Sequence, residues 1–220
     1  MKTINVIAVA ALMFACSSTS FAQFVGTGGG SRASAGSADQ FTTFWVTYAP
    51  TNFKGGISGY SIGESGYNTF AMGLTHASPL SGSSLMVDYG AFAEWIHKSE
   101  TDDGVKMSED LIGVKVPISL MYGLDLADNV VIYPYAGLNA RFFIVGKVTE
   151  KYQNESESQN IFEDGNGLKR FSLGYQVGLR AKLSGFIIGV GYEDMITSMS
   201  SQSNVNLKIN MITISAGIPF

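Results

Sequence analysis

The sequence predicts an all-β protein, an eight-stranded antiparallel up-and-down transmembrane β-barrel, and three observations lead to that fold class. Charged residues make up only 15% of the chain, against about 25% in typical soluble domains, yet no apolar run after residue 23 reaches the roughly 18 residues of a helical membrane span. Apolar residues instead alternate with small or polar ones over long stretches. Finally, short and long connections alternate along the chain, which is typical of membrane barrels.

The alternation is clearest in three strands. They are expected at residues 112–122, 171–183 and 212–220, where one face is entirely apolar and the other carries mostly Gly, Ser, Thr, Gln, Lys and Arg. Five further strands follow the same period less perfectly, at residues 42–48, 70–76, 85–95, 132–144 and 186–192. Several are as long as the roughly 9–11 residues with which a tilted strand crosses a bilayer. We therefore expect eight strands whose apolar faces contact lipid.

The connections predict the orientation of these strands. Short turns are expected at residues 77–84, 123–129 and 184–185. Longer connections are expected at 49–69, 96–111, 145–170 and 193–211, the last of which includes strand extensions. Outer-membrane barrels place short turns on the periplasmic side and long loops outside. The first and last residues of the barrel would then both lie on the periplasmic side. The acidic clusters at residues 100–110 and 150–164 would lie outside the cell.

Aromatic residues fall near the ends of the predicted apolar faces, as in the two aromatic girdles of a membrane protein. The predicted girdle residues at the long-loop end are Tyr48, Phe70, Trp95, Phe142, Phe171 and Tyr192. Those at the short-turn end are Tyr122, Phe186 and Phe220.

The beginning of the chain predicts export. Residues 1–22 combine a lysine, a short apolar stretch and a small-x-small site ending at Ala22, which indicates a cleaved signal peptide. The single cysteine, Cys16, lies inside this segment, so lipidation at Cys16 is the alternative to cleavage after Ala22. Residues 23–40 are rich in Gly, Ser and Ala and predict a flexible leader. The barrel is expected over residues 41–220.

The last strand carries a resemblance to a known family. Its alternate residues are apolar and it ends on an aromatic residue: Ile212, Ile214, Ala216, Ile218 and Phe220. Together with "YPYAGLNARF" at Tyr133–Phe142, this pattern resembles the small outer-membrane β-barrel proteins of Gram-negative bacteria, the OmpA/OmpX-like porin superfamily. The resemblance implies a place in the bacterial outer membrane, contact with lipid and lipopolysaccharide, and recognition of the last strand by the barrel-assembly machinery. It implies no particular activity.

The inward faces carry charges of both signs, and these predict a lumen network. The candidate residues are Asp88, Glu94, Lys115, Arg141, Arg180, Lys182 and Glu193. Paired charges can satisfy one another in a barrel whose interior is just wide enough for side chains. We therefore expect a lumen largely plugged by salt bridges, and a structural or surface-interaction role in the envelope. The alternative is a narrow porin for small solutes or ions.

Other classes of function are disfavoured. The net charge of −4 argues against nucleic acid as a partner, and no cofactor, metal or catalytic residue is predicted. A lipid A-modifying enzyme is the weaker alternative, since His76-Ala77-Ser78 and Glu94 resemble parts of a hydrolase site. His76 is expected at the periplasmic end and His97 at the opposite end, so the two cannot share a metal. The ligand of the loops and the oligomeric state are left open.

Overall fold

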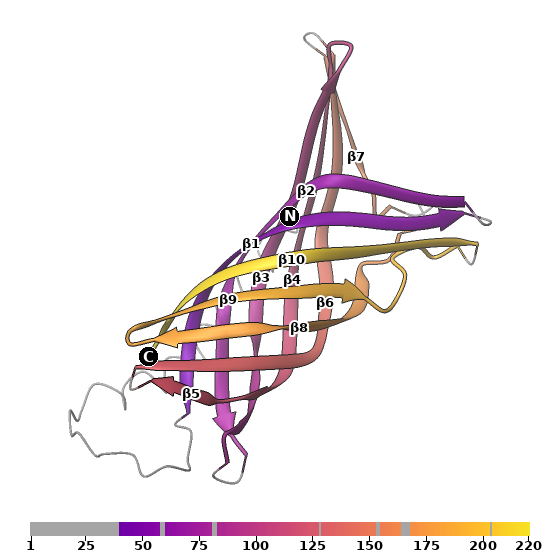
Figure 1. Cartoon of the computed structure of the whole chain (residues 1–220). Helices are drawn as coiled ribbons and strands as arrows, with labels where there is room; N and C mark the ends of the chain where they lie inside the picture. The colour runs from indigo at the N-terminus through magenta and orange to yellow at the C-terminus, as the bar shows by residue number, and fades with distance from the viewer. Residues whose placement is uncertain are drawn as a thin grey trace, which may run out of the picture. The chain divides into compact units, whose positions relative to one another are not determined.

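The computed structural model describes residues 40–57, 60–80, 83–127, 129–152, 155–163, 168–202 and 204–220. The predicted signal peptide and all but one residue of the predicted leader lie outside these ranges. Within them, no helix is long and apolar enough to cross a membrane. The regular elements of the described residues are all β-strands (Figure 1).

Eight strands form the wall of the barrel. Their bounds are β1 Phe41–Ile57, β2 Tyr60–Pro79, β3 Leu85–Asp102, β4 Val105–Tyr122, β6 Val130–Tyr152, β8 Phe171–Leu183, β9 Phe186–Met195 and β10 Val205–Pro219. Each predicted strand has a counterpart in this set, and Phe171–Leu183 has the predicted bounds. Two short strands were not predicted: β5 Leu124–Ala127 and β7 Glu155–Asn160, which extend the two edges of β6.

The sheet closes on itself. Every neighbouring pair is antiparallel, and the two ends of the strand order are joined because β4 also pairs with β6. The first and last strands form the second seam, where Thr43 lies opposite Pro219. Thr42 and Phe220 exchange two backbone hydrogen bonds there, of 2.8 and 3.2 Å. This closed ring of eight strands confirms the predicted antiparallel barrel and leaves no open edge between β1 and β10.

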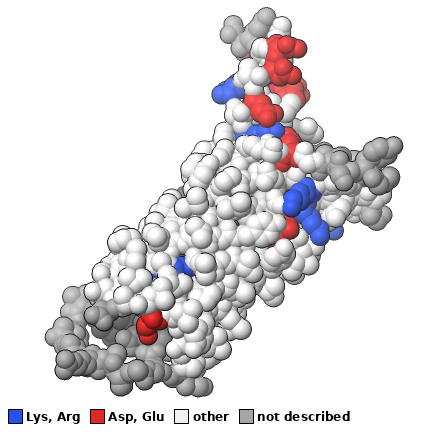
Figure 2. Space-filling view, in the orientation of Figure 1, with Lys and Arg blue, Asp and Glu red and all other residues white. Residues whose placement is uncertain are grey.

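Burial follows the expected period of two. In β1, Thr43 and Trp45 are buried, whereas the alternate residues Phe44 and Val46 are 40% and 54% exposed. The same outward apolar surface continues around the ring, with Met72, Ile118 and Ile212 among its residues. The face seen in Figure 2 is almost free of charged side chains between its two ends. Such a surface fits hydrocarbon rather than water, which is the setting of a transmembrane barrel.

The strands are longer than predicted at one end, so much of the expected loop regions is strand. β3 and β4 continue as a hairpin to a turn at Asp103 and Gly104, both at positive φ, and β6 continues to Tyr152. These extensions project beyond the other strands (Figure 1). The prediction of loops at 49–69, 96–111 and 145–170 was wrong: strands occupy most of these residues. The strands were missed because most outward residues there are polar. Apolar residues therefore no longer alternate with polar ones in these segments, although the strands remain paired through their backbones.

Candidate functional site in the barrel lumen

The inward residues of β3 give the layers of the lumen in order. From the short-turn end they are Met86, Asp88, Phe92, Glu94, Ile96 and Lys98, all buried. Met86, Phe92 and Ile96 each belong to a separate apolar cluster. Two layers of buried charge, at Asp88 and Glu94, therefore alternate with apolar layers. The strands of the ring surround the lumen that holds these layers (Figure 1).

Four of the predicted lumen charges meet in the middle layer. Lys115 Nζ lies 2.9 Å from Glu193 Oε1 and 3.4 Å from Glu94 Oε1. Arg141 donates from Nε to Glu94 Oε2 at 3.0 Å and from Nη2 to Glu193 Oε2. Because these residues come from β3, β4, β6 and β9, their ion pairs cross the lumen rather than follow one strand pair. We call Glu94, Lys115, Arg141 and Glu193 the central network.

The central network is neutral and almost completely enclosed. It contains two acids and two bases, and their side chains are between 1% and 6% exposed. Arg141 Nη1 also donates to Asn139 Oδ1 at 3.0 Å, and Lys115 Nζ lies 4.9 Å from the centre of the Phe92 ring. Charges this far from water persist only when they are paired and hydrogen-bonded. All four charges are paired and each residue makes at least one hydrogen bond, while Glu94 Oε1 has, among the described residues, only its ion-pair contact with Lys115.

A second ion pair lies nearer the short-turn end. Arg180 donates to Asp88 Oδ2 at 2.7 Å, and its guanidinium lies 4.8 Å from the Trp45 ring centre and 4.6 Å from that of Tyr135. A planar guanidinium stacks well on aromatic faces. Lys182 lies apart: among the described residues it has no ion pair with the other predicted lumen charges, and its Nζ lies over the Phe41 ring at 4.7 Å.

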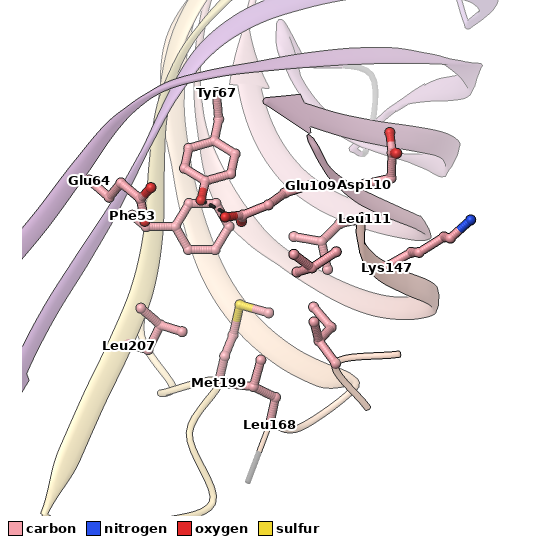
Figure 3. Close-up of a pocket in the computed structure, with 12 residues that line it drawn as sticks. Phe53, Glu64, Tyr67, Glu109, Asp110, Leu111, Lys147, Leu168, Met199 and Leu207 are labelled. Atoms are coloured by element: carbon pink, nitrogen blue, oxygen red, sulfur yellow. Dashed lines mark hydrogen bonds between the residues drawn. The ribbon is translucent and has the colours of Figure 1, made fainter. Parts of the chain in front are cut away.

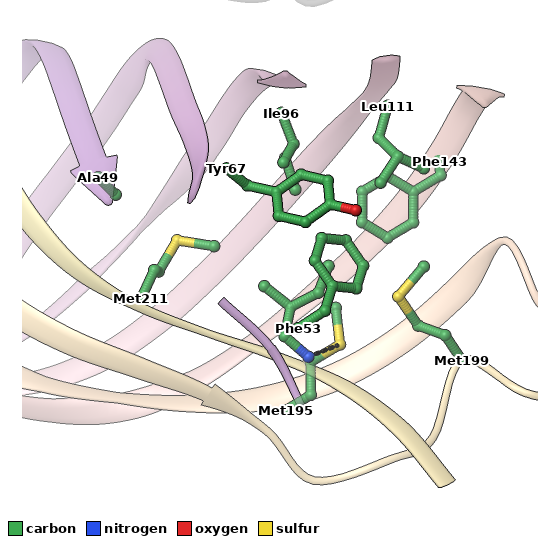
Figure 4. Close-up of a cluster of buried hydrophobic side chains, with 10 residues drawn as sticks. Ala49, Phe53, Tyr67, Ile96, Leu111, Phe143, Met195, Met199 and Met211 are labelled. Carbon is green, nitrogen blue, oxygen red and sulfur yellow. Dashed lines mark hydrogen bonds between the residues drawn. The ribbon is translucent and has the colours of Figure 1, made fainter. Parts of the chain in front are cut away.

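An apolar plug lies between the central network and the end of the barrel where β3, β4 and β6 project beyond the other strands. We call that end the long-strand side. The apolar plug consists of the ten buried residues that share one cluster: Ala49, Phe53, Tyr67, Ile96, Leu111, Phe143, Met195, Met199, Ile209 and Met211. In Figure 4 the rings of Phe53, Tyr67 and Phe143 meet at the centre of this cluster, with methionines around them. The Phe53 and Tyr67 ring centres are 4.4 Å apart. The plug separates the central network from the projecting ends of the strands.

The cavity beside the central network is small. A polar cavity of about 30 Å³ is lined by Lys115, Glu193, Arg180, Gln176 and neighbouring side chains. Since one water needs about 10–15 Å³ of such volume, the cavity has room for about two molecules. That volume is far below what an aqueous channel requires.

The predicted girdle residues lie at the outer surface. Tyr48, Phe70 and Trp95 are opposite one another in the register of β1, β2 and β3, with ring centres 5.4 and 5.9 Å apart. Phe142 is directly opposite Phe171 in the same way. Tyr122, Phe186 and Phe220 are exposed at the other end, whereas Tyr192 is only partly exposed and donates to Asp194. In the last strand, Ile212, Ile214 and Ile218 also point outward.

The residues considered for catalysis do not come together. His76 lies opposite Tyr89 on the outward face of β2, since its neighbours Thr75 and Ala77 are buried inside. Glu94 points into the lumen, opposite Ala71 in the register, and is held by Arg141. His97 binds Asp110 at 2.9 Å near the long-strand end. No group of three or more possible metal ligands occurs among the described residues.

A further cluster of polar groups, not predicted from the sequence, lies on the side of the apolar plug that faces the projecting strand ends. Tyr67 donates to Glu109 Oε2 at 2.6 Å, and Lys98 donates to Glu64 Oε1 at 2.5 Å. Burial, together with Glu109, raises the pKa of the Tyr67 phenol above its ordinary value, so the phenol stays a donor. Burial opposes the charge of Lys98, but its bonds to Glu64 and Glu100 outweigh this and raise its pKa. Lys98 and Glu109 lie on the β3–β4 hairpin, and the Asp103-Gly104 pair at its turn is a sequence signal that could have predicted it.

The fold is similar to that of solved outer-membrane proteins. Ail, the attachment invasion locus protein of Yersinia pestis, matches with a TM-score of 0.45 at 16% identity, over 83% of this chain and 100% of that one. Neisserial surface protein A matches at 0.41 and 13%, over 80% and 97%. The outer membrane enzyme PagL matches at 0.46 and 12%, over 78% and 99%.

At these identities the similarity concerns the fold alone. Neither a protein-family model nor a curated protein matches the sequence.

Proposed function

We propose that the protein is an integral barrel of the bacterial outer membrane that acts in envelope structure or surface contact and does not conduct solutes. The observation that supports this most is the closed lumen: the central network, which joins four strands, and the apolar plug on one side of it. Together they fill the cross-section of an eight-stranded barrel, whose interior is just wide enough for side chains.

The outward surface supports the membrane placement. Every strand of the ring has exposed large apolar residues, which are Tyr89 and Trp95 on β3 and include Val, Ile, Leu, Met or Phe on the other strands. Aromatic residues lie near both ends. Exposed apolar surface of this extent would make a protein in water aggregate. Lipid on the outside and ion pairs on the inside account for both faces of each strand. The last strand is proposed to be the segment that the assembly machinery recognises.

A strain that lacks the gene tests the proposed role. If the protein supports the envelope, the strain should become more sensitive to detergent and EDTA, while uptake of small hydrophilic solutes should not fall. Complementation with the wild-type gene should restore resistance. If the deletion instead lowers solute uptake and leaves detergent resistance unchanged, the narrow-porin alternative replaces this proposal. Altered lipid A mass on expression would indicate an enzyme.

A further inference from the structure

The projecting ends of the strands enclose a pocket beyond the apolar plug. Its volume is about 170 Å³, and twelve residues line it: Phe53, Glu64, Tyr67, Glu109, Asp110, Leu111, Lys147, Val148, Ile161, Leu168, Met199 and Leu207. We call this space the mouth pocket (Figure 3). Because the plug forms its floor, the mouth pocket does not lead into the central network, and a molecule that enters it stays on the long-strand side.

Most of the mouth pocket is apolar. Phe53, Leu111 and Met199 belong to the plug, and Leu168 and Leu207 line the pocket on the same side as Met199 (Figure 3). An apolar cavity of about 150 Å³ in another protein is large enough to bind benzene. The mouth pocket is thus large enough for one aromatic ring or a short aliphatic chain.

Its charged side is acidic. In Figure 3 the side chains of Asp110 and Lys147 point away from the pocket, whereas Glu109 points toward Tyr67 and Phe53. Asp110 binds Trp95 and His97 on the outer face. Glu64 and Glu109 then remain beside the pocket, with Lys98 as the cation near them. Lys98 also binds Glu100 at 3.0 Å, so its charge is shared with a carboxylate outside the pocket.

Glu109 has one oxygen open to a ligand. Tyr67 donates to its Oε2, while its Oε1 has no hydrogen-bond partner among the residues that the structure describes. The phenol also fixes the orientation of the carboxylate over the apolar floor. An apolar pocket with few, convergent polar groups is the usual form of a small-molecule site.

From this arrangement we infer that the mouth pocket binds a small organic cation, with an apolar body about the size of one aromatic ring and an ammonium group that pairs with Glu109. The body lies against Phe53, Leu111 and Met199, and the ammonium donates to Glu109 Oε1, with Glu64 as a second, more exposed carboxylate. A carboxylate with the same body is repelled. This assignment does not depend on the role proposed for the whole barrel.

The test uses methyl NMR of the full protein in lipid nanodiscs, with ¹³C-labelled methionine methyl groups and 2-phenylethylamine as the probe. The Met199 signal, assigned with Met199→Leu, should shift and saturate. The dissociation constant should be at least tenfold lower than for 2-phenylethanol or phenylacetate, which have the same ring. Met72 points outward and is 60% exposed, so its signal reports partitioning into lipid and should not saturate.

Two variants separate the charge from the cavity. Glu109→Gln should weaken binding of the amine at least tenfold and leave the alcohol unchanged, and Leu207→Trp should abolish binding by filling the pocket. The control Glu157→Gln removes a carboxylate from β7, outside the pocket lining, and should bind like the wild type. Equal affinity for amine and carboxylate, or no saturable shift of Met199 in the wild type, would overturn the assignment. If a variant does not fold, the order of the wild-type affinities for the amine, the alcohol and the carboxylate decides whether the assignment holds.

Discussion

Arg141 is the one residue of the central network that donates hydrogen bonds to both buried carboxylates, Glu94 and Glu193. Its guanidinium joins Glu94 and Glu193, and it also holds the Asn139 amide oxygen. Its side chain is 1% exposed, so no water can replace these bonds without a change in the lumen. Without Arg141, the two buried carboxylates would share Lys115 alone, which leaves one negative charge without a partner.

We therefore expect Arg141→Ala to lower the free energy of unfolding by about 3–5 kcal/mol, the usual cost of removing one partner of a buried ion pair. Urea unfolding in lipid vesicles, followed by tryptophan fluorescence, measures the change. Adding Glu193→Gln to the variant should recover part of the loss because one unpaired charge is then gone. Lys151→Ala, at an exposed site on β6, is the control. A loss below about 0.5 kcal/mol for Arg141→Ala would show that the central network is not stabilised by this residue.

Lys98 gives a prediction about pH, because its folded-state pKa is raised by Glu64 and Glu100 despite burial. Where the folded pKa of a lysine exceeds the unfolded one, the stability from its partners is complete below the unfolded value, about 10.4. It is lost as pH rises through the folded value. Between pH 9 and pH 12, the wild type should thus lose more stability than Lys98→Met. Parallel curves for the two proteins in urea unfolding would contradict the pairing.

At the scale of the elements, inward glycines set how closely neighbouring strands approach. A Cβ on Gly73 of β2 would lie 2.2 Å from the Ala91 carbonyl oxygen and 2.7 Å from Phe92 Cα in β3. These are backbone atoms, so a side chain at this position requires the strand itself to move. Gly63, in the same strand, has nothing within 4 Å of the corresponding position.

We expect Gly73→Ala to destabilise the barrel by about 1–3 kcal/mol, the range for overpacked sites. Gly63→Ala should be neutral or stabilising by up to about 1 kcal/mol, since alanine restricts the unfolded chain. Unfolding midpoints in urea compare the two variants directly. If both variants have the same midpoint, close contact between β2 and β3 is not what position 73 requires.

The closing strand carries a separate prediction. Phe220 both donates its backbone N–H to Thr42 and accepts a bond from it, and its side chain is 46% exposed on the outside. Deleting Phe220 should lower the amount of barrel assembled in the outer membrane severalfold, whereas Phe220→Tyr should be mild because tyrosine also suits a membrane interface. Cell fractionation with unheated SDS gels measures assembly. Normal assembly of the deletion variant would show that the seam does not need this residue.

At the scale of the whole molecule, the wall of the barrel was predictable from sequence because lipid and lumen impose opposite demands on successive residues. That contrast gave all eight strands of the ring. It failed at the projecting ends, where both faces of the Lys98–Asp102 segment meet polar surroundings. β5 and β7 were missed because each is short and exposed along its whole length, so neither has a buried face to contrast with an outward one.

The lumen was predictable only in part. The period of two indicates that Glu94, Lys115, Arg141 and Glu193 face inward, but not which of them meet. Arg141 and Glu193 are 52 positions apart on strands that are not neighbours, so their contact depends on strand register and tilt. The period of two also predicts that Lys182 faces inward, but its ammonium lies over the Phe41 ring and does not join the central network. Tyr67 and Glu109 were missed because they lie in segments expected to be loops.

The proposed function depends most on a lumen closed by the central network and the apolar plug, and current through single molecules measures this closure directly. Purified wild-type protein in planar lipid bilayers should give no steady conductance steps in 1 M KCl. Glu193→Ala, which leaves Lys115 and Arg141 with one carboxylate fewer, should give brief openings. Large, stable, ion-selective steps from the wild type would contradict the closed lumen and establish the barrel as a pore.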